Sequence, residues 1–315
     1  MMVSQAVVFV GIDVGKFVCV AAVHGRAGVV KFAPDAAGIG RFLGLLTELE
    51  GEARVGLEAT GGYEAALWEA VEGAGFQVRQ LAPARVHAYA RSVGRLTKTD
   101  RYDAVTIAAC LAANPTAGRR LPPANLRRTR GLYAKRRQLV EMGEALGCQR
   151  LQARAPLVTG LDDAHMALIG TQIAALEAEA AALIATDPGL AERRRLLLTI
   201  PGIGTVTSAT LPAEMPELGT LPARAAAALA GLAPFARDSG TVSGKRFIRG
   251  GRGVVRGVLN MAALSASTCN PGPRLFAQRL KASHKPGKLI LTAVARKLIE
   301  TANAVLERKS EWTPR

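Results

Sequence analysis

Near the start of the chain, the stretch Val7–Lys16 (VVFVGIDVGK) passes from an apolar, β-branched run through Gly11 to a single carboxylate, Asp13, and then to a glycine turn. A short apolar run bounded by a glycine turn is typical of a buried strand. Two more apolar runs follow closely, Phe17–Val23 and Val29–Phe32, with glycines between them. We therefore expect three antiparallel strands in succession.

From these strands to residue 118, the pattern alternates between helix and strand. The expected elements are a helix over about 39–49, a strand over 53–57 that ends at Glu58, a helix over 64–73, a strand over 76–81 and a helix over 100–113. Three strands followed by this alternation is the element order of the ribonuclease H-like fold. The sequence therefore predicts an α/β domain over residues 1–118.

Residues 119–195 are expected to form a helical, coiled-coil linker. Leucines recur at seven-residue spacing from Leu132 to Leu146, and apolar residues alternate steps of four and three from Ile169 to Leu183. These spacings predict the two arms of a long helical hairpin, with breaks at Pro156 and Gly160. The seams are compatible with packing inside one protomer or with pairing between two.

The last segment, residues 196–315, is predicted to be mainly α-helical. Its turn Ile200–Gly204 (IPGIG) resembles the hairpin of a helix-hairpin-helix, which points backbone N–H groups at a DNA phosphate. Gly202 and Gly204 are therefore candidate nucleic-acid contacts. A plain turn between two helices remains the alternative.

The composition narrows the class of protein. The 315 residues are 49% hydrophobic, with 41 Lys and Arg against 25 Asp and Glu, a net charge of +16. This hydrophobic content excludes a disordered chain, and four cysteines without a C-x-x-C pair exclude a disulfide framework. No uninterrupted apolar run reaches the roughly 18 residues of a membrane span. We expect a soluble, reduced, intracellular protein with no membrane partner.

The positive charge is concentrated towards the C-terminus. Residues 1–118 carry 11 basic and 11 acidic side chains, residues 119–195 carry 13 and 8, and residues 196–315 carry 17 and 6. A polyanion would therefore be bound chiefly by the last segment. A generally basic surface that only aids solubility is the alternative.

Four carboxylates stand where the predicted fold would gather them. Asp13 and Glu58 end predicted strands, and Asp100 and Asp103 share one face of a helix. Clustered carboxylates repel one another unless cations neutralise them, and their oxygens suit Mg²⁺ or Mn²⁺. We predict a metal site that can act on a phosphodiester. The alternative is that each acid is a helix cap or a solvated surface group.

A similar strand and glycine turn also opens the sugar-kinase and actin-like ATPases. That fold requires a second phosphate-binding element of the form Asp-x-Gly-x-Thr, and the sequence contains neither this element nor a G-x-x-x-x-G-K-[ST] loop. ATP binding is therefore disfavoured.

A serine lies in a stretch rich in glycine and arginine, residues 237–257. Ser239 could hydrogen-bond a phosphate or attack one, with nearby cations stabilising the phosphoryl charge. The candidate phosphate-binding cations are Arg237, Lys245, Arg246, Arg249, Arg252 and Arg256. No histidine is close in sequence to serve as a base for the serine.

These motifs, in this order, resemble one known family: the DEDD transposases of the IS110 insertion elements. The matching stretches are Gly11–Val14 (GIDV), Leu57–Tyr63 (LEATGGY), Lys98–Ala104 (KTDRYDA), Ile200–Gly204 (IPGIG) and Gly231–Pro234 (GLAP) through to Gly240. No single stretch is specific, but the ordered set is.

The resemblance implies a RuvC-like N-terminal domain in which Asp13, Glu58, Asp100 and Asp103 bind Mg²⁺ or Mn²⁺. It implies Ser239 as the nucleophile that forms a transient phosphoserine link to DNA. Many members have a serine pair followed by glycines where this chain has Asp238–Gly244 (DSGTVSG), so Ser243 is a second candidate.

The resemblance also implies partners: donor and target DNA, a noncoding guide RNA from the element, and dimers that join into a tetramer. The RuvC-like domain of one protomer would then approach the serine of another. The protein would be cytoplasmic and associated with the nucleoid when it acts. Two other functions remain open from the residues: a metal-dependent junction nuclease that uses water as its nucleophile, and a non-catalytic nucleic-acid-binding protein.

Overall fold

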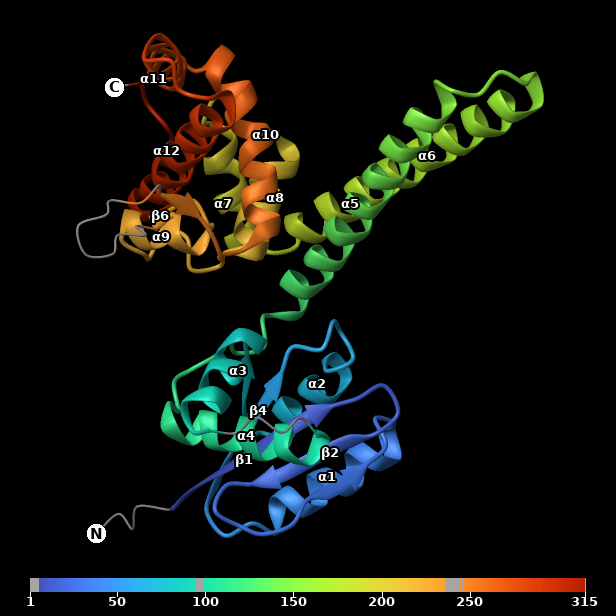
Figure 1. The fold of residues 1–315 in the computed structure, drawn as a ribbon, viewed down its shortest axis with the longest axis vertical. Coiled ribbons are helices and arrows are strands. Elements are labelled where there is room, and N and C mark those ends of the chain that lie inside the picture. The colour runs from blue at the N-terminus through green and yellow to red at the C-terminus, as the bar shows by residue number, and fades with distance from the viewer. Residues whose placement is uncertain (1–5, 95–98, 236–243, 245, 315) are drawn as a thin grey trace. The chain divides into compact units, whose positions relative to one another are not determined.

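The computed structural model describes residues 6–94, 99–235, 244 and 246–314. Its backbone divides into two compact units, Met1–Pro122 and Pro123–Arg315 (Figure 1). We call these the N-terminal unit and the C-terminal unit. Most of the predicted helical linker, from residue 123 onward, belongs to the C-terminal unit.

The N-terminal unit is a mixed α/β structure. Its elements are β1 (Val7–Val14), β2 (Cys19–Val23), β3 (Val30–Phe32), α1 (Ala36–Thr47), β4 (Glu52–Glu58), α2 (Ala65–Gly73), β5 (Gln77–Leu81), α3 (Pro83–Ser92) and α4 (Asp100–Ala113). The strand order is β3-β2-β1-β4-β5; β1, β4 and β5 are parallel, and β2 is antiparallel to both of its neighbours. The predicted order of elements is confirmed. The sequence did not predict α3, in which Val86 is the buried residue.

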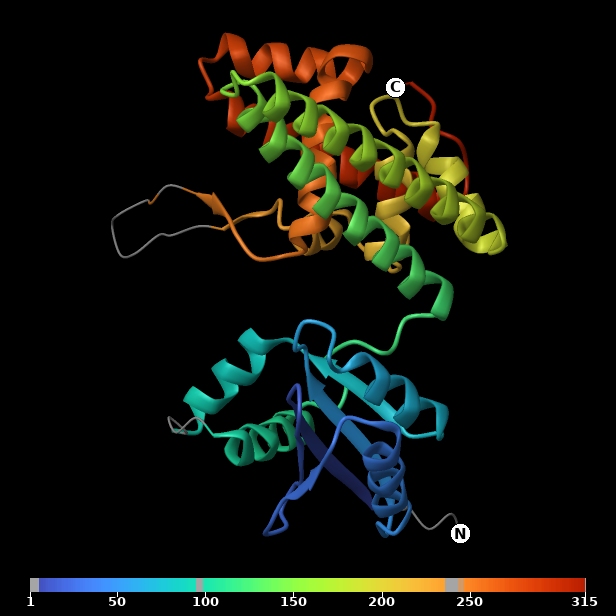
Figure 2. The ribbon, with the colours of Figure 1, turned by 90° about the vertical axis from the view of Figure 1, so that its right-hand side faces the viewer.

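Helices cover both faces of this sheet, and the alternation of side chains along β1 separates the two faces (Figure 2). Val10, Ile12 and Val14 belong to the core cluster that contains residues of α1 and α2. Phe9 instead packs with residues of α3 and α4. Because successive side chains of a strand point to opposite faces, Asp13 lies on the same face as Phe9, the face that α4 covers.

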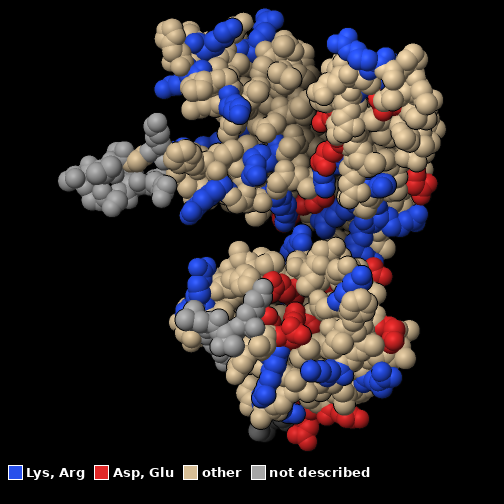
Figure 3. Space-filling view, turned by 45° about the vertical axis from the view of Figure 1, so that its right-hand side comes forward, with Lys and Arg blue, Asp and Glu red and all other residues tan. Residues whose placement is uncertain are grey.

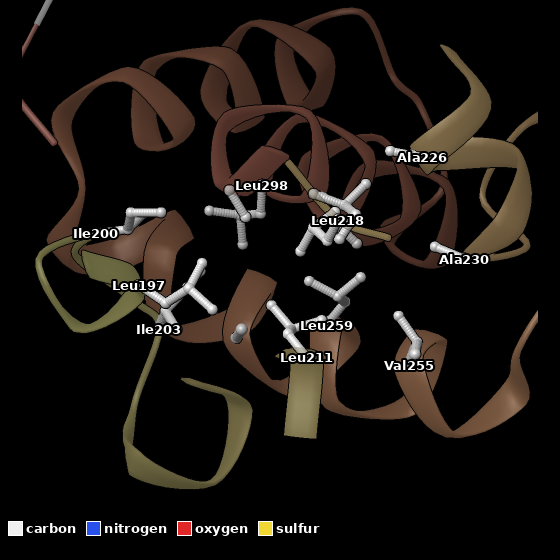
Figure 4. Packing of buried hydrophobic residues seen from close by; sticks show 14 of the residues in the cluster. Leu197, Ile200, Ile203, Leu211, Leu218, Ala226, Ala230, Val255, Leu259 and Leu298 are labelled. Atoms are coloured by element: carbon white, nitrogen blue, oxygen red, sulfur yellow. The ribbon is translucent and has the colours of Figure 1, made fainter. Parts of the chain in front are cut away.

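The C-terminal unit is almost entirely helical. Its elements are α5 (Ala124–Arg150), α6 (Pro156–Ala185), α7 (Pro188–Leu198), α8 (Thr205–Glu214), α9 (Ala223–Leu229), β6 (Pro234–Phe235), β7 (Phe247–Ile248), α10 (Gly253–Cys269), α11 (Pro271–Ala282) and α12 (Gly287–Arg308). Apolar residues of α7 to α10 and α12 meet in one core, in which Leu197, Leu211, Leu259 and Leu298 are buried (Figure 4).

The predicted hairpin is formed by α5 and α6, which run side by side (Figure 1). Leu139 and Leu146 of α5 line the same cavity as Ile169 of α6, so the two predicted seams face each other. Ion pairs join the two arms, including Arg136–Glu177 at 2.5 Å. Pro156 begins α6 as predicted, but the expected break at Gly160 is wrong, because the helix continues through it.

Helix α6 is also the one helix in the described part of the chain that is long and apolar enough to cross a membrane by length and composition. The sequence pattern did not predict such a segment. Two aspartates, Asp162 and Asp163, lie in its first half, and Asp163 pairs with Arg150 of α5. Ala180, Leu183 and Ile184 of α6 are buried, whereas Leu157, Leu161 and Leu168 are exposed.

Candidate functional site

The sheet places two of the four predicted carboxylates side by side. In the parallel pair of β1 and β4, Ile12 is opposite Leu57. The next residues of the two strands are Asp13 and Glu58, at the carboxyl ends of the strands. Neighbouring strands are about 4.8 Å apart, so these two backbone positions are adjacent.

Helix α4 lies directly against these strands because glycines allow it. A Cβ atom on Gly11 would lie closer than 3.0 Å to backbone atoms of Ala104 and Ala108. A Cβ on Gly56 of β4 would touch Ile107 and Leu111. Gly11 and Asp13 share a face of β1, as Gly56 and Glu58 share a face of β4, so both carboxylates belong to the face covered by α4.

The direction of α4 brings its first turn to the same edge. Further along the helix, Ile107 and Leu111 pack with Phe9, which precedes Gly11 on β1. The beginning of α4 therefore lies towards the carboxyl end of β1, where Asp13 is found. The first turn of α4 carries Asp100 and Asp103.

The start of α4 is fixed by its N-cap. The hydroxyl of Thr99 accepts a hydrogen bond from the backbone N–H of Tyr102 at 3.5 Å, so the helix begins at Asp100. Asp13, Glu58 and Asp103 are half-buried, whereas Asp100 is exposed. Figure 3 shows acidic side chains gathered on one face of the N-terminal unit.

The carboxylates fit a divalent ion in their chemistry, since four hard oxygen donors suit Mg²⁺ or Mn²⁺. The side chains are not preassembled around such an ion: among the described residues, no three His, Cys, Asp or Glu side chains are grouped so that they could hold a metal. The backbone brings the carboxylates to one edge of the sheet, but their side chains do not converge on a common metal position. Burial, and to a lesser degree the Asp13 carboxylate, raises the pKa of the nearby Cys19 thiol, and a backbone hydrogen bond at Gly15 opposes them.

A fifth acid, which the sequence analysis missed, lies six residues after Glu58. Glu64 is only 7% exposed, and its carboxylate accepts hydrogen bonds from the N–H and hydroxyl of Thr60, the N–H of Gly62 and the side-chain amide of Gln80. Burial alone would raise the pKa of Glu64, but the hydrogen bonds outweigh burial and hold it below its ordinary value. A carboxylate after a Gly-Gly turn was the available signal, but its partner Gln80 is distant in sequence.

Ser239, the predicted nucleophile, lies outside the described residues, as do Ser243, Arg237 and Lys245. The structure does describe the two chain segments that lead into this loop and out of it. They pair as the short antiparallel ribbon of β6 and β7, which was not predicted. Phe235 and Phe247 are opposite each other on this ribbon and are 42% and 56% exposed.

The two chain segments that flank the ribbon come into backbone contact at Gly231 and Gly251. A Cβ on Gly251, where φ is +65°, would lie closer than 3.0 Å to the backbone of Gly231. A Cβ on Gly231 would in turn meet the carbonyl of Gly250 and the guanidinium of Arg256. The N–H of Arg252 donates to the carbonyl of Leu229 at 2.8 Å. The base of the loop is thus a close backbone contact.

The arginines predicted to bind phosphate have different surroundings. The guanidinium of Arg252 forms an ion pair with Glu217 and donates to the carbonyl of Glu214 at 2.6 Å. These donors of Arg252 are thus engaged within the fold, and its role in phosphate binding stays a prediction. Arg256 donates to the carbonyl of Gly250 at 2.8 Å, and Arg249 stacks over the Phe235 ring at 5.4 Å from its centroid. Arg246 is exposed.

The predicted turn Ile200–Gly204 does join two helices, α7 and α8. Gly202 has φ of +99°, and a Cβ there would collide with Ala266 of α10, so this glycine is needed for packing. Gly204 is exposed at the N-terminus of α8, which no described side chain caps. Of the two glycines, Gly204 is the one whose surroundings leave room for a phosphate.

Comparisons with known proteins find two transposase family models along this chain. Residues 10–153 match a transposase family model of the DEDD IS110 type, and residues 194–278 match the model described as "Transposase IS116/IS110/IS902 family". Proteins named "Pilin gene-inverting protein" from Moraxella bovis and Moraxella lacunata are each 30% identical over 270 residues, which cover 82% of this chain and 81% of theirs.

A Streptomyces coelicolor protein named "Insertion element IS110 uncharacterized 43.6 kDa protein" is 31% identical over 134 residues, which is 42% of this chain and 32% of that protein. The first family match spans all four predicted carboxylates, and the second spans the turn, the loop and the ribbon. The chain therefore belongs to the IS110 family of transposases, enzymes that act on DNA.

Proposed function

We propose that this transposase cuts and rejoins DNA strands through a phosphoserine intermediate, with a RuvC-like, ribonuclease H-type domain that binds divalent metal. Residues 1–118 form this domain, residues 119–195 the coiled-coil linker and residues 196–315 the transposase domain. The observation that carries the proposal is that Asp13 and Glu58 are neighbours on the sheet face that the first turn of α4, with Asp100 and Asp103, adjoins.

In the proposed reaction, the Ser239 oxygen forms a bond to the phosphorus of a DNA strand. The bond from phosphorus to a deoxyribose oxygen breaks, and that oxygen leaves as a free hydroxyl after taking up a proton. The serine proton passes to a base outside its own loop. In the second half, a deoxyribose hydroxyl of another strand displaces serine, so no phosphodiester energy is lost.

Asp13, Glu58, Asp100 and Asp103 would hold the divalent ions, Mg²⁺ or Mn²⁺, which when bound supply charge neutralisation at phosphate oxygens. By family resemblance, these carboxylates act on the serine loop of another protomer within a tetramer formed by two dimers. Exposed cations at the ribbon, Arg246 and Arg249, would bind the DNA backbone, with Arg237, Lys245 and Arg256 close by in sequence. Gly204 and the N-terminus of α8 would receive a second phosphate.

The experiment that tests the nucleophile is a denaturing gel of reaction products. Ser239→Ala should bind DNA normally and form no covalent protein–DNA adduct, whereas the matched Ser243→Ala variant should retain the adduct. Adduct formation only by Ser239→Ala, with its loss in Ser243→Ala, would move the assignment to Ser243. DNA cut by the wild type with no protein attached would instead support a junction nuclease that uses water.

We further propose that a guide RNA selects the DNA on which the protein acts. If base pairing selects the DNA, the protein reads duplex shape and backbone, and the target is not encoded in the chain. Changing the loop of an RNA transcribed from the element's ends should then redirect cleavage to a DNA of the new sequence. Cleavage of the same DNA with every RNA, or without any, would remove the guide from the mechanism. Such a protein would work in the cytoplasm at the nucleoid.

The relatives named for pilin gene inversion point to a second use of the same chemistry. Strand exchange between two sites excises or inverts the intervening DNA according to the relative orientation of the sites. A plasmid with two element ends placed in either orientation distinguishes these outcomes, since excision yields two circles and inversion leaves one circle with a reversed segment.

A further inference from the structure

Glu64 occupies the N-cap position of α2, but its carboxylate does not act as a cap. Among the described residues, no hydrogen bond joins this side chain to the first turn of α2. The carboxylate instead turns back to the loop that precedes it, where it accepts from the Thr60 N–H at 3.2 Å, the Thr60 hydroxyl at 2.9 Å and the Gly62 N–H at 2.9 Å. Helix capping therefore does not explain why a buried acid is found here.

The loop that Glu64 holds begins directly after Glu58. At Gly61 and Gly62, φ is +78° and +114°, and a Cβ on either residue would meet no described atom within 4 Å. These two positions are therefore not fixed by packing around them. Backbone hydrogen bonds hold the two ends of this loop, from the Ala59 N–H to the Leu81 carbonyl and from the Ala65 N–H to the Gly62 carbonyl. Between them, the hydrogen bonds to the Glu64 carboxylate restrain Thr60 and Gly62, and so help to determine how the chain leaves the end of β4.

The same carboxylate ties the end of β4 to the next strand. The amide of Gln80, on β5, donates to Glu64 at 2.7 Å, and the Gln80 side-chain oxygen accepts from the guanidinium of Arg119 at 2.6 Å. Gln80 and Arg119 also exchange both backbone hydrogen bonds at 2.9 Å. Leu81, the neighbour of Gln80, is the residue that pairs with Glu58. The network therefore runs along the edge where Glu58 ends its strand.

We propose that Glu64 is a positioning residue for Glu58: its buried carboxylate holds the Thr60–Gly62 loop and Gln80, and thereby sets the place of the Glu58 carboxylate relative to Asp13. This inference rests on the proposed metal-binding role of the four acids. A buried anion is suited to the task, because a carboxylate with several donors holds them more strongly than a neutral acceptor does. Partners that orient metal ligands typically change metal affinity 10- to 100-fold when removed.

The chain offers a matched control on the same strand. Glu52, at the opposite end of β4, accepts from Arg54 at 3.1 Å and from Gln77 of β5 at 2.9 Å. Glu52→Gln therefore removes a comparable carboxylate, with Arg and Gln partners, at the end away from Glu58. A milder pair, Thr60→Ala and Thr60→Ser, removes and restores one donor to Glu64 without touching an acid.

The experiment measures Mn²⁺ binding to the full-length protein without DNA, by the free-ion electron paramagnetic resonance signal, for wild type, Glu64→Gln, Glu52→Gln, both Thr60 variants and Asp13→Asn. We expect an affinity about tenfold weaker in Glu64→Gln, unchanged in Glu52→Gln, severalfold weaker in Thr60→Ala and restored in Thr60→Ser. Amide hydrogen exchange of the metal-free protein provides a second readout: exchange at Thr60 and Gly62 should be faster in Glu64→Gln and unchanged in Asp13→Asn.

The outcomes separate this inference from the function on which it rests. Weak binding by Asp13→Asn, together with wild-type affinity in Glu64→Gln, would overturn the positioning role and leave the metal site standing. Undiminished affinity in Asp13→Asn would overturn the metal site itself, and the positioning role with it. If Glu64→Gln does not fold, the Thr60 pair decides: equal affinities in Thr60→Ala and Thr60→Ser would overturn the inference.

Discussion

We call the sheet edge that carries Asp13 and Glu58 the acid edge of the N-terminal unit. It is formed differently from the base of the serine loop in the C-terminal unit, where Gly231 and Gly251 are in contact. At the acid edge, regular elements carry the side chains that are predicted to bind metal, and a buried network around Glu64 holds the loop beside them. At the base of the serine loop, two strands of only two residues are held by glycines that let the backbones touch and by an arginine turned inward.

The contrast extends to charge. Residues 1–118 have as many acids as bases, whereas residues 196–315 have nearly three times as many bases as acids. Because residues 1–118 have no net charge, a cluster of carboxylates there still attracts cations. The excess of basic side chains in residues 196–315 attracts a polyanion to the serine loop. Under the proposed function, the N-terminal unit would provide the cation ligands and the C-terminal unit would bind DNA.

The largest effects should come from the glycines at which backbones touch. Gly11→Ala would drive a methyl group into the backbone of α4, so the N-terminal unit should lose about 3 kcal/mol of unfolding free energy. Gly251→Ala combines a similar collision with an unfavourable φ of +65°. It should open the base of the serine loop locally, and the C-terminal unit should lose less unfolding free energy than the N-terminal unit loses in Gly11→Ala. Urea unfolding and hydrogen exchange measure the two losses.

The control for both changes is a glycine with open space around it. Gly257→Ala, inside α10, should gain up to about 1 kcal/mol, because a Cβ there meets no described atom within 4 Å. A loss in Gly257→Ala as large as that in Gly11→Ala would contradict the assignment of the effect to close backbone approach.

Arg252 and Arg249 test whether the arginines of the basic segment divide into structural and DNA-binding residues. Arg252→Met leaves the half-buried Glu217 without its ion-pair partner and should cost about 2 kcal/mol of unfolding free energy. Arg249→Met should change stability by no more than about 0.5 kcal/mol, since its side chain is exposed. Equal losses in the two variants would break the division.

The pH dependence of the unfolding free energy tests whether the charge of Glu64 stabilises the acid edge. The folded-state pKa of Glu64 is below its ordinary value, so its contribution is complete above the unfolded pKa of about 4.3 and is lost as pH falls through the folded pKa. Wild type should exceed Glu64→Gln by about 1.5 kcal/mol at pH 7, and the gap should narrow below about pH 4. A gap that is constant from pH 7 to pH 3 would mean that the charge of Glu64 is not what its partners stabilise.

The elements of both units could largely be predicted from the sequence, because their signals are local. The strands around Asp13 follow from β-branched runs and glycines, and the hairpin follows from seven-residue spacing. The predictions were wrong where the local signal was weak. Helix α3 was not predicted, and its one buried residue is Val86. Gly160 was predicted to break a helix, but it is accommodated inside α6, which packs against α5. The two-residue strands of the ribbon are too short to show a period.

Side-chain roles were harder to predict because partners are distant in sequence. Arg252 was assigned to phosphate binding from its neighbours in the chain, yet its carboxylate partner Glu217 is 35 residues away. Glu64 was overlooked because Gln80, 16 residues on, is what makes it part of a network. The four carboxylates could be placed at one edge of the sheet from the sequence because they stand at or near element ends, but their role as metal ligands stays a prediction.

The smallest expected effect concerns DNA binding at the ribbon. Arg249 lies over the Phe235 ring, so removing either side chain breaks the same contact, but only one of them carries charge. If Arg249 neutralises a phosphate, the slope of log affinity against log salt should become less negative by about 0.9 in Arg249→Ala. The affinity at low salt should fall severalfold. Phe235→Ala frees the guanidinium without removing its charge, so that slope should stay at its wild-type value. Fluorescence anisotropy with a labelled duplex at four salt concentrations measures both, and an equal change in the two slopes would mean that the aromatic ring, rather than the cation, governs contact with DNA.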